Sequence, residues 1–324
     1  MVTTDYHEPV LLTETLGTLD LQPGAVILDG TLGGGGHAEA ILEQTGPDGL
    51  LIGLDLDTDA LREAGARLEP FGARVRLYQS SFRRLGDIAE EISPQRIDGI
   101  VFDLGVSSHQ LDAPERGFRF GPSEPDGSDA GKSPLDMRMD AAGDRDPASA
   151  LLASWNAEQL EKIFSEYGQL PGSRRLAKAI VARRETAPFE TAGDLVSLIR
   201  EVGIGRGRRH NPATLVFQAL RIAVNDEMGA LKEGLEAAIK ALRPGGHLAV
   251  IAYHSLEDRI VKHAFRAAAK GCVCPSDWPA CQCGIAPSVV LQMRRPIMPS
   301  DDEIGRNPRA RSARLRAATR LEAG

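Results

Sequence analysis

Short apolar runs alternate with segments of helical periodicity over the first 112 residues. The apolar runs predict strands at residues 25–31, 50–57, 75–81 and 97–106. Helical patterns lie between them, for example over residues 58–68. Strands that alternate with helices are typical of a parallel sheet that is covered by helices on both faces. The chain is therefore expected to begin with an α/β domain.

The pattern changes after residue 112. Residues 113–147 have the composition of a loop, and Gly, Pro, Ser and Asp are abundant in residues 121–133. Apolar residues at helical spacing then dominate residues 148–240. This spacing predicts helices at residues 157–167, 174–184, 192–202 and 212–242.

Strand character returns towards the C-terminus, at residues 246–255, 289–293 and 311–318. The simplest prediction is one discontinuous α/β domain that is interrupted by an all-helical insertion. The α/β domain would comprise residues 1–112 and 217–324, and the insertion would comprise residues 113–216.

Composition narrows the class of protein further. A hydrophobic fraction of 42% is sufficient for a core, and the net charge of -7 gives no global indication of nucleic-acid binding. Positive charge is nevertheless concentrated locally, because residues 294–320 carry eight arginines against three acidic residues. The N-terminus lacks the pattern of a signal peptide, and no apolar run approaches the length of a membrane span. We therefore expect a cytoplasmic protein that does not contact a membrane.

The segment Val26-Ile-Leu-Asp-Gly-Thr-Leu-Gly-Gly-Gly-Gly-His37 carries the strongest indication of chemistry. It predicts a strand, a tight glycine turn and the start of a helix, where backbone N–H groups attract an anionic group. Asp55 ends the second apolar run and is suited to accept hydrogen bonds from ribose hydroxyls. The pattern predicts a nucleoside-cofactor site for NAD, FAD or S-adenosylmethionine, although four consecutive glycines fit the usual dinucleotide spacing poorly.

Polar residues also follow the fourth and fifth predicted strands. Ligands of open α/β sheets bind beyond the carboxyl ends of the strands, which favours a site role for Asp103, Ser107, Ser108 and Gln110. The alternative is a turn that only caps a helix. His254 lies at the end of a later strand and is a second candidate. The alternative there is a helix capped by Ser255, with Asp258 at the capping-box position.

Several arginines lie beside aromatic, thioether, glycine or proline residues, an arrangement that suits contact with RNA bases and phosphates. The alternative is packing or a solvated charged surface. The candidates are Arg116, Arg119, Arg138, Arg206, Arg208, Arg209, Arg309 and Arg311.

The four cysteines of the chain are Cys272, Cys274, Cys281 and Cys283. Four thiolates within twelve residues suit a structural zinc ion. Zinc-binding pairs usually have two to four intervening residues, however, whereas each pair here has one. Reduced thiols in a loop are the alternative.

Seven sequence motifs in this order closely resemble the MraW family of ribosomal RNA small subunit methyltransferases. The resemblance spans nearly the whole chain. The motifs are His7-Glu-Pro-Val-Leu-Leu12, Asp29 to His37, Phe102-Asp-Leu-Gly-Val-Ser-Ser108, Pro134 to Asp140, Phe217 to Asn225, His254-Ser-Leu-Glu-Asp-Arg259 and Asn307-Pro-Arg-Ala-Arg-Ser312.

The resemblance implies an S-adenosylmethionine-dependent enzyme that methylates the exocyclic N4 of one cytosine in 16S ribosomal RNA, at the decoding centre. It implies a Rossmann-like class I methyltransferase sheet with an inserted helical domain for the substrate. Its cofactor positions fall on Gly33, Gly35, Gly36, His37, Asp55, Phe82, Asp103 and Gln110, with Phe82 against the adenine. The chain departs from the family in a longer segment at residues 121–133, and only some members have the cysteine cluster.

Methylation of cytosine N4 requires an acceptor that favours a rehybridised amine, because the nitrogen lone pair is delocalised into the ring. Asp103 is the first candidate acceptor, Ser107 or Ser108 would orient it, and His254 would take the proton. The expected partner is 16S ribosomal RNA within the small subunit, and a homodimer is left open. Two alternatives stay open: a DNA amino-methyltransferase, whose usual Pro-Pro box is absent after Asp103, and a noncatalytic RNA-binding assembly factor.

Overall fold

The computed structural model describes residues 9–92, 97–107, 110, 113–120, 130–204, 211–275, 278 and 280–322. The chain forms two compact units, Met1–Gly105 with Met228–Gly324, and Val106–Glu227. The boundaries differ from the expected positions at residues 112 and 217. The reason is that Val106 and the helix that contains Phe217 pack into the core of the second unit.

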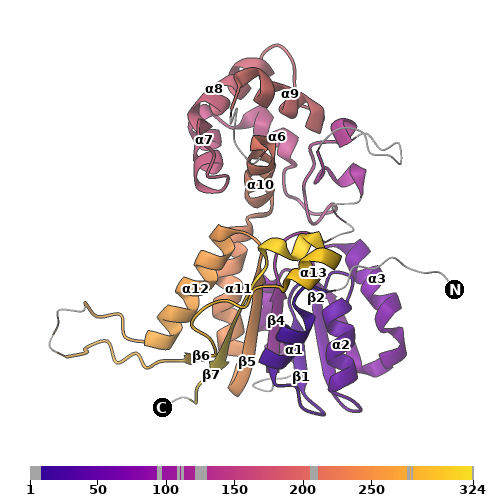
Figure 1. Ribbon diagram of the computed structural model, residues 1–324, viewed down its shortest axis with the longest axis vertical. Helices are drawn as coiled ribbons and strands as arrows, with labels where there is room; N and C mark the ends of the chain where they lie inside the picture. Colours follow the sequence, from indigo (N-terminus) through magenta and orange to yellow (C-terminus); the bar gives the residue numbers. More distant parts are fainter. Residues whose placement is uncertain are drawn as a thin grey trace. The chain divides into compact units, whose positions relative to one another are not determined.

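A seven-stranded sheet forms the centre of the first unit (Figure 1). Its order is β3-β2-β1-β4-β5-β7-β6, in which β7 pairs antiparallel with both β5 and β6 and the remaining pairs are parallel. This topology and the helical second unit confirm the predicted fold class. The strands are β1 (Val26–Asp29), β2 (Leu50–Asp55), β3 (Val75–Gln79), β4 (Ile97–Asp103), β5 (Leu242–Ala252), β6 (Val289–Leu291) and β7 (Arg314–Arg320).

Helices cover both faces of the sheet because successive residues of each buried strand point to opposite sides. Ile27 and Leu51 pack with α1, α2 and α3, whereas Leu28 and Ile52 pack with α4, α11 and α12. The helices of this unit are α1 (Leu12–Leu19), α2 (Gly36–Gln44), α3 (Thr58–Leu68), α4 (Leu85–Ile92), α11 (Glu227–Ala241, whose first residue is counted with the second unit), α12 (Ser255–Lys270) and α13 (Asp301–Arg306).

The second unit is helical and has its own apolar core. Its helices are α6 (Ala148–Ser154), α7 (Ala157–Glu166), α8 (Ser173–Arg184), α9 (Ala192–Val202) and α10 (Pro212–Asn225). The side chain of Asn225 links the end of α10 to the segment at residues 137–139. Its amide oxygen accepts a hydrogen bond of 2.8 Å from Met139 N, and its amide nitrogen donates one of 2.8 Å to Met137 O. Within the described ranges, no helix has the length and apolar character that crossing a bilayer requires.

The prediction of one helix over residues 212–242 was wrong. The chain forms α10 and α11, and Asp226 between them has a φ of 49°. An aspartate tolerates this left-handed conformation better than most residues do. The break follows directly on Asn225, whose side-chain contacts with the segment at residues 137–139 fix the end of α10.

Candidate functional site

The glycine turn joins β1 to α2 and is open on one side. Gly33 and Gly35 have φ values of 51° and 80°, which side chains rarely allow. A Cβ at Gly35 would lie 3.2 Å from Ala64 Cβ, so the inner side of the turn is packed. A Cβ at Gly33 would meet only Thr31 O, at 3.9 Å. The turn therefore leaves room for a ligand near Gly33, beside the backbone N–H groups at the start of α2.

Asp55 ends β2 beside this turn. Its Oδ2 accepts a hydrogen bond of 2.8 Å from Gly33 N, and its Oδ1 accepts one of 2.9 Å from Asp57 N. Burial raises the pKa of Asp55 to about 6, although the two backbone hydrogen bonds oppose the shift. A carboxylate has about four acceptor positions, so Asp55 retains acceptor capacity for a ligand hydroxyl.

Phe82 follows β3, the next strand along the same edge of the sheet. Its ring centroid lies 5.1 Å from that of Phe102. Gly234 lies directly against the Phe82 ring, since a Cβ there would approach Phe82 Cδ2 to 2.4 Å. The Phe82 ring is thus packed against two residues of the first unit, Phe102 and Gly234.

Asp103 ends β4 and lies at the centre of a buried polar group. The Tyr253 hydroxyl donates to its Oδ1 at 2.8 Å, and His37 Nδ1 lies 3.7 Å from its Oδ2. Burial raises the pKa of Asp103 to about 7, the hydrogen bond from Tyr253 lowers it, and the charge of Glu257 raises it. The side chain is still 26% exposed. Asp103 can therefore both reach a ligand and exchange a proton near neutral pH.

His37 and Asp29 flank this aspartate from the glycine turn. His37 Nε2 lies 3.1 Å from the carbonyl oxygen of Val10, and burial lowers the pKa of the imidazole. A neutral ring that donates from Nε2 has Nδ1 as its acceptor, on the side of Asp103. Asp29 is 2% exposed, its Oδ1 accepts from Thr31 N at 3.0 Å, and burial raises its pKa to about 7. Two carboxyl groups and one imidazole thus meet at the ends of β1 and β4.

His254 caps α12, so the alternative in which Ser255 caps this helix is wrong in its capping residue. The His254 ring accepts from Glu257 N at 3.3 Å, and the Glu257 carboxylate accepts from His254 N at 3.2 Å. The same carboxylate accepts from Tyr253 N at 2.8 Å, and Glu257 is only 2% exposed. Asp258 does not take part in this cap, because it pairs with arginines of β7. The reciprocal cap and the bond from Tyr253 N to Glu257 together fix the backbone position of Tyr253.

Ser107 and Gln110 belong to the second unit and bind each other. Ser107 N donates to Gln110 Oε1 at 3.1 Å, and Gln110 N donates to Ser107 Oγ at 3.2 Å. These bonds are those of a local cap, the alternative that the sequence left open. Ser108 lies outside the described residues.

The arginines that were predicted to bind RNA have different environments. Arg116 is 9% exposed and donates to the carbonyl oxygens of Arg138 and Met139. Arg138 forms a two-pronged ion pair with Asp136, at 2.8 and 2.9 Å, which lowers the pKa of that carboxyl against the effect of its burial. Both guanidinium groups therefore order the segment before α6.

The remaining arginines fall into three groups. Arg119 is half-buried, and Arg309 and Arg311 are exposed in the short helix η5 (Pro308–Ser312). The other three, Arg206, Arg208 and Arg209, lie outside the described residues. The four cysteines lie together between α12 and β6 and are considered separately below.

Sequence reasoning did not select Asp29, Tyr253 or Glu257. Asp29 and Tyr253 lie at the ends of predicted strands, so the rule that selected Asp103 applies to them as well. Glu257 stands at the third helical position after His254, where a capping-box acid is expected once the start of α12 is known.

Comparison with known proteins gives a consistent result. The model of the MraW methylase family matches residues 4–321. A protein of Symbiobacterium thermophilum named ribosomal RNA small subunit methyltransferase H is 48% identical, over 98% of this chain and 98% of that protein. Proteins of the same name from Heliobacterium modesticaldum and Geobacter sulfurreducens are 47% and 48% identical, and each alignment covers at least 97% of this chain and 99% of the relative.

Proposed function

Because the chain belongs to the MraW methylase family, we propose that it transfers a methyl group from S-adenosylmethionine to 16S ribosomal RNA. The acceptor would be the exocyclic N4 of one cytosine at the decoding centre of the small subunit. The observation that carries this proposal is the position of Asp103 at the end of β4. Its side chain is partly exposed, it is bound to Tyr253, and His37 of the glycine turn lies beside it.

The residues beside the glycine turn fit S-adenosylmethionine. The start of α2 would receive the methionine carboxylate, and Asp55 would accept hydrogen bonds from the ribose hydroxyls. Phe82 would pack against the adenine.

S-adenosylmethionine supplies an electrophilic methyl group on a positively charged sulfur. In the transfer, a bond forms between cytosine N4 and the methyl carbon, the sulfur–carbon bond breaks, and N4 loses one proton. Ionised Asp103 would accept a hydrogen bond from the N4 amino group, which favours a pyramidal nitrogen with an available lone pair. With a pKa of about 7, Asp103 is suited to receive the proton that N4 releases.

Tyr253 and Glu257 would hold this acceptor in place. Tyr253 directs one oxygen of Asp103, and His37 lies on the side of the other. Glu257 binds the backbone N–H of Tyr253, so it fixes the position of the phenol indirectly. We propose that His254, which caps α12, contributes through this junction as a positioning residue.

The RNA would be bound by exposed arginines and by the helical unit. Arg309 and Arg311 are the exposed candidates in the first unit. We propose that the helical unit recognises the RNA substrate, with Ser107 and Gln110 at its start. Extraction of the target base from its stack would be part of binding, as for other enzymes that act on nucleobases.

Transfer of a labelled methyl group tests the proposed function. Small subunits that lack the modification are incubated with the enzyme and labelled S-adenosylmethionine, and the RNA is then digested to nucleosides. The proposal expects label in N4-methylcytidine, and little label with the Asp103→Ala variant. Label in DNA but not in RNA would favour an amino-methyltransferase of DNA. RNA binding without turnover would instead indicate an assembly factor.

A further inference from the structure

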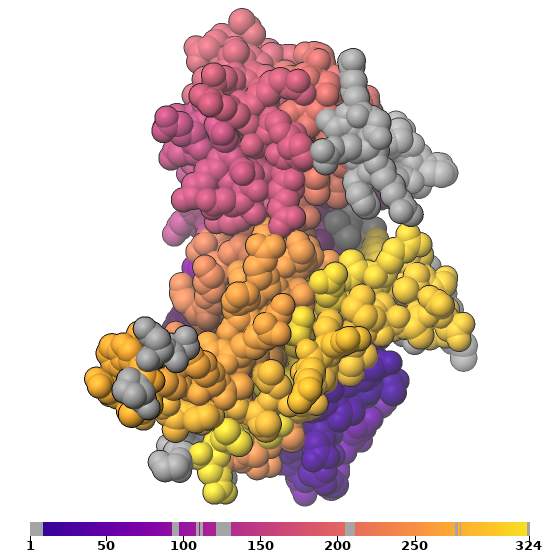
Figure 2. Space-filling view, turned by 60° about the vertical axis from the view of Figure 1, so that its left-hand side comes forward, coloured from indigo at the N-terminus to yellow at the C-terminus, as the bar shows by residue number. Residues whose placement is uncertain are grey.

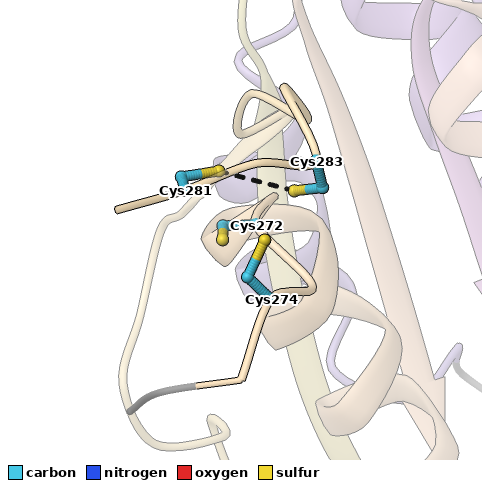
Figure 3. Close-up of side chains that lie close together, drawn as sticks. All are labelled: Cys272, Cys274, Cys281 and Cys283. Carbon is cyan, nitrogen blue, oxygen red and sulfur yellow. Dashed lines mark hydrogen bonds between the residues drawn. The ribbon is translucent and has the colours of Figure 1, made fainter. Parts of the chain in front are cut away.

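The four cysteines converge on one point although they come from two separate parts of a loop (Figure 3). All four sulfur atoms lie within 4.8 Å of one another, and the Sγ atoms of Cys281 and Cys283 are 3.5 Å apart. All four side chains are free thiols. A disulfide would require a sulfur–sulfur distance of about 2.05 Å, so the cluster has the spacing of neighbouring ligands rather than of bonded pairs.

The spacing agrees with tetrahedral coordination of a metal. Zinc–thiolate bonds are about 2.3 Å long, which places the sulfur atoms of a regular tetrahedron roughly 3.8 Å apart. The observed separations, from 3.5 Å up to the 4.8 Å limit, bracket this value. Four soft thiolate ligands in this geometry are typical of zinc sites in proteins.

The single residue between the cysteines of each pair does not prevent this arrangement. In an extended chain, residues i and i+2 point to the same side, so each Cys-x-Cys pair can direct two thiolates at one ion. The backbone also supports the cluster, since Gln282 N donates to Cys274 Sγ at 3.3 Å. Such hydrogen bonds stabilise a thiolate ligand and fix its direction.

The surrounding segment has little else to hold it together. Between α12 and β6, the described residues form no helix or strand. Three apolar residues of the segment are exposed to solvent, Val273 at 72%, Trp278 at 46% and Ile285 at 50%. Figures 1 and 2 show the segment standing out from the sheet and helices of its unit. A segment without an apolar core needs another source of order, and a metal ion is the common one in small loops.

The two ends of the segment are fixed where it leaves and rejoins the unit. Ser288 N donates to Ala268 O at 2.8 Å, which ties the returning chain to the end of α12. Gly271 has a φ of 68°, and a Cβ there would approach the carbonyl carbon of Ala286 to 2.4 Å. The base of the loop is thus closed independently of the cysteines, and the ion would order only the part beyond it.

We propose that Cys272, Cys274, Cys281 and Cys283 bind one zinc ion as four thiolates. The role of the ion would be structural, because four protein ligands leave no open position for a substrate. Distance supports this role. The 16 residues of α12 span about 24 Å, and they separate His254 at the carboxyl edge of the sheet from the first cysteine.

Metal analysis of the purified full chain tests the proposal. The protein is prepared with reductant and zinc, freed of unbound metal, and analysed for its elements. One zinc per chain is expected. Because the chain has four cysteines in all, any cobalt–thiolate absorption after replacement of zinc by cobalt must come from this cluster. Titration of the wild type with a mercurial reagent should release the zinc as the four thiols react, and this measurement needs no variant.

Matched variants then locate the site. Cys272→Ser and Cys283→Ser should each lose zinc, and limited proteolysis should cut their loop faster. Val273→Ser introduces the same residue at an exposed neighbour and should retain one zinc. A reduced, zinc-supplemented wild type without zinc or cobalt–thiolate absorption would overturn the proposal. Disulfides in the reduced preparation, or iron in place of zinc, would overturn it as well. No methyl donor or RNA enters these measurements, so they are independent of the proposed function.

Discussion

The Tyr253 hydroxyl donates a hydrogen bond of 2.8 Å to Asp103 Oδ1 and thereby joins the ends of β5 and β4. Burial, together with the charge of Asp103, raises the pKa of Tyr253 well above its usual value, so the phenol stays protonated. It therefore donates to the ionised form of Asp103. The hydrogen bond stabilises the ionised carboxylate against the burial that raises its pKa. Tyr253 thus both orients the proposed acceptor and sets its proton affinity.

We predict that Asp103→Asn slows methyl transfer much more than it weakens cofactor binding. Asparagine keeps the size of the side chain but cannot take a proton. General-base contributions are typically about 10²–10⁴-fold, so a loss of that order is expected in single-turnover rate on the saturated complex. Calorimetry of S-adenosylmethionine should show a dissociation constant within a few-fold of the wild type. A wild-type rate would remove Asp103 as the N4 acceptor.

Tyr253→Phe should shift the pH profile of the same rate. The phenol lowers the pKa of Asp103, and its removal leaves burial and the charge of Glu257 to raise that pKa further. The rise of the single-turnover rate with pH should therefore move to higher pH. A variant with a lower rate but an unshifted profile would show that Tyr253 supports the fold without acting on Asp103.

Asp55→Ala should weaken binding of S-adenosylmethionine by about tenfold or more. The variant loses a charged acceptor for the ribose hydroxyls, and hydrogen bonds to charged groups contribute about 1.5–3 kcal/mol each. Asp59→Ala is the matched control, because Asp59 lies on α3 four residues later and pairs with the exposed Arg62. Equal dissociation constants for the wild type and Asp55→Ala, measured by calorimetry, would exclude Asp55 from the cofactor site.

The sequence was sufficient for the parts of the fold that depend on local pattern. Apolar β-branched runs predicted the buried strands. The glycine turn and the apolar run that follows it indicated Asp55, and the rule for carboxyl ends of strands indicated Asp103. The division between α10 and α11 was not predictable in this way. It depends on Asn225, which contacts a segment more than 80 residues earlier. No local pattern reports such a contact.

The hydrogen bond between Asp103 and Tyr253 was likewise not predictable from local sequence patterns. Asp103 and Tyr253 are 150 residues apart, and their hydrogen bond depends on the register between β4 and β5. The cysteine cluster is the opposite case, since its sequence spacing argued against a zinc site. The backbone conformation that brings both Cys-x-Cys pairs together is visible only in three dimensions.

We predict that Asp29 makes the folded state less stable as pH rises. The carboxyl has a pKa of about 7 in the folded protein against 3.8 as the reference, so the folded state keeps a proton that the unfolded state releases. The free energy of unfolding should therefore fall between about pH 4 and pH 7, by at most about 1.4 kcal/mol per pH unit from this residue. Below and above that window its contribution should not vary.

Urea unfolding at several pH values measures this effect. Asp29→Asn removes the titration, so the free energy of unfolding of the wild type minus that of the variant should decrease from pH 5 to pH 7. Asp59→Asn, which removes a carboxylate that pairs with Arg62 on α3, is the matched control. A difference that is constant over this range would show that Asp29 is already ionised in the folded protein.

Arg309 and Arg311 should contribute phosphate contacts in RNA binding. Both side chains are exposed, and residues 294–320 are rich in arginine. Replacing both with alanine should weaken binding and lower the slope of log affinity against log salt by about 0.7–0.9 per lost contact. Arg62→Ala, which removes a side chain that is 75% exposed on α3, is the control for loss of charge alone. The triple alanine variant of Arg206, Arg208 and Arg209 extends the same measurement to the helical unit. A double variant that binds RNA with the salt dependence of the wild type would show that neither Arg309 nor Arg311 contributes a phosphate contact.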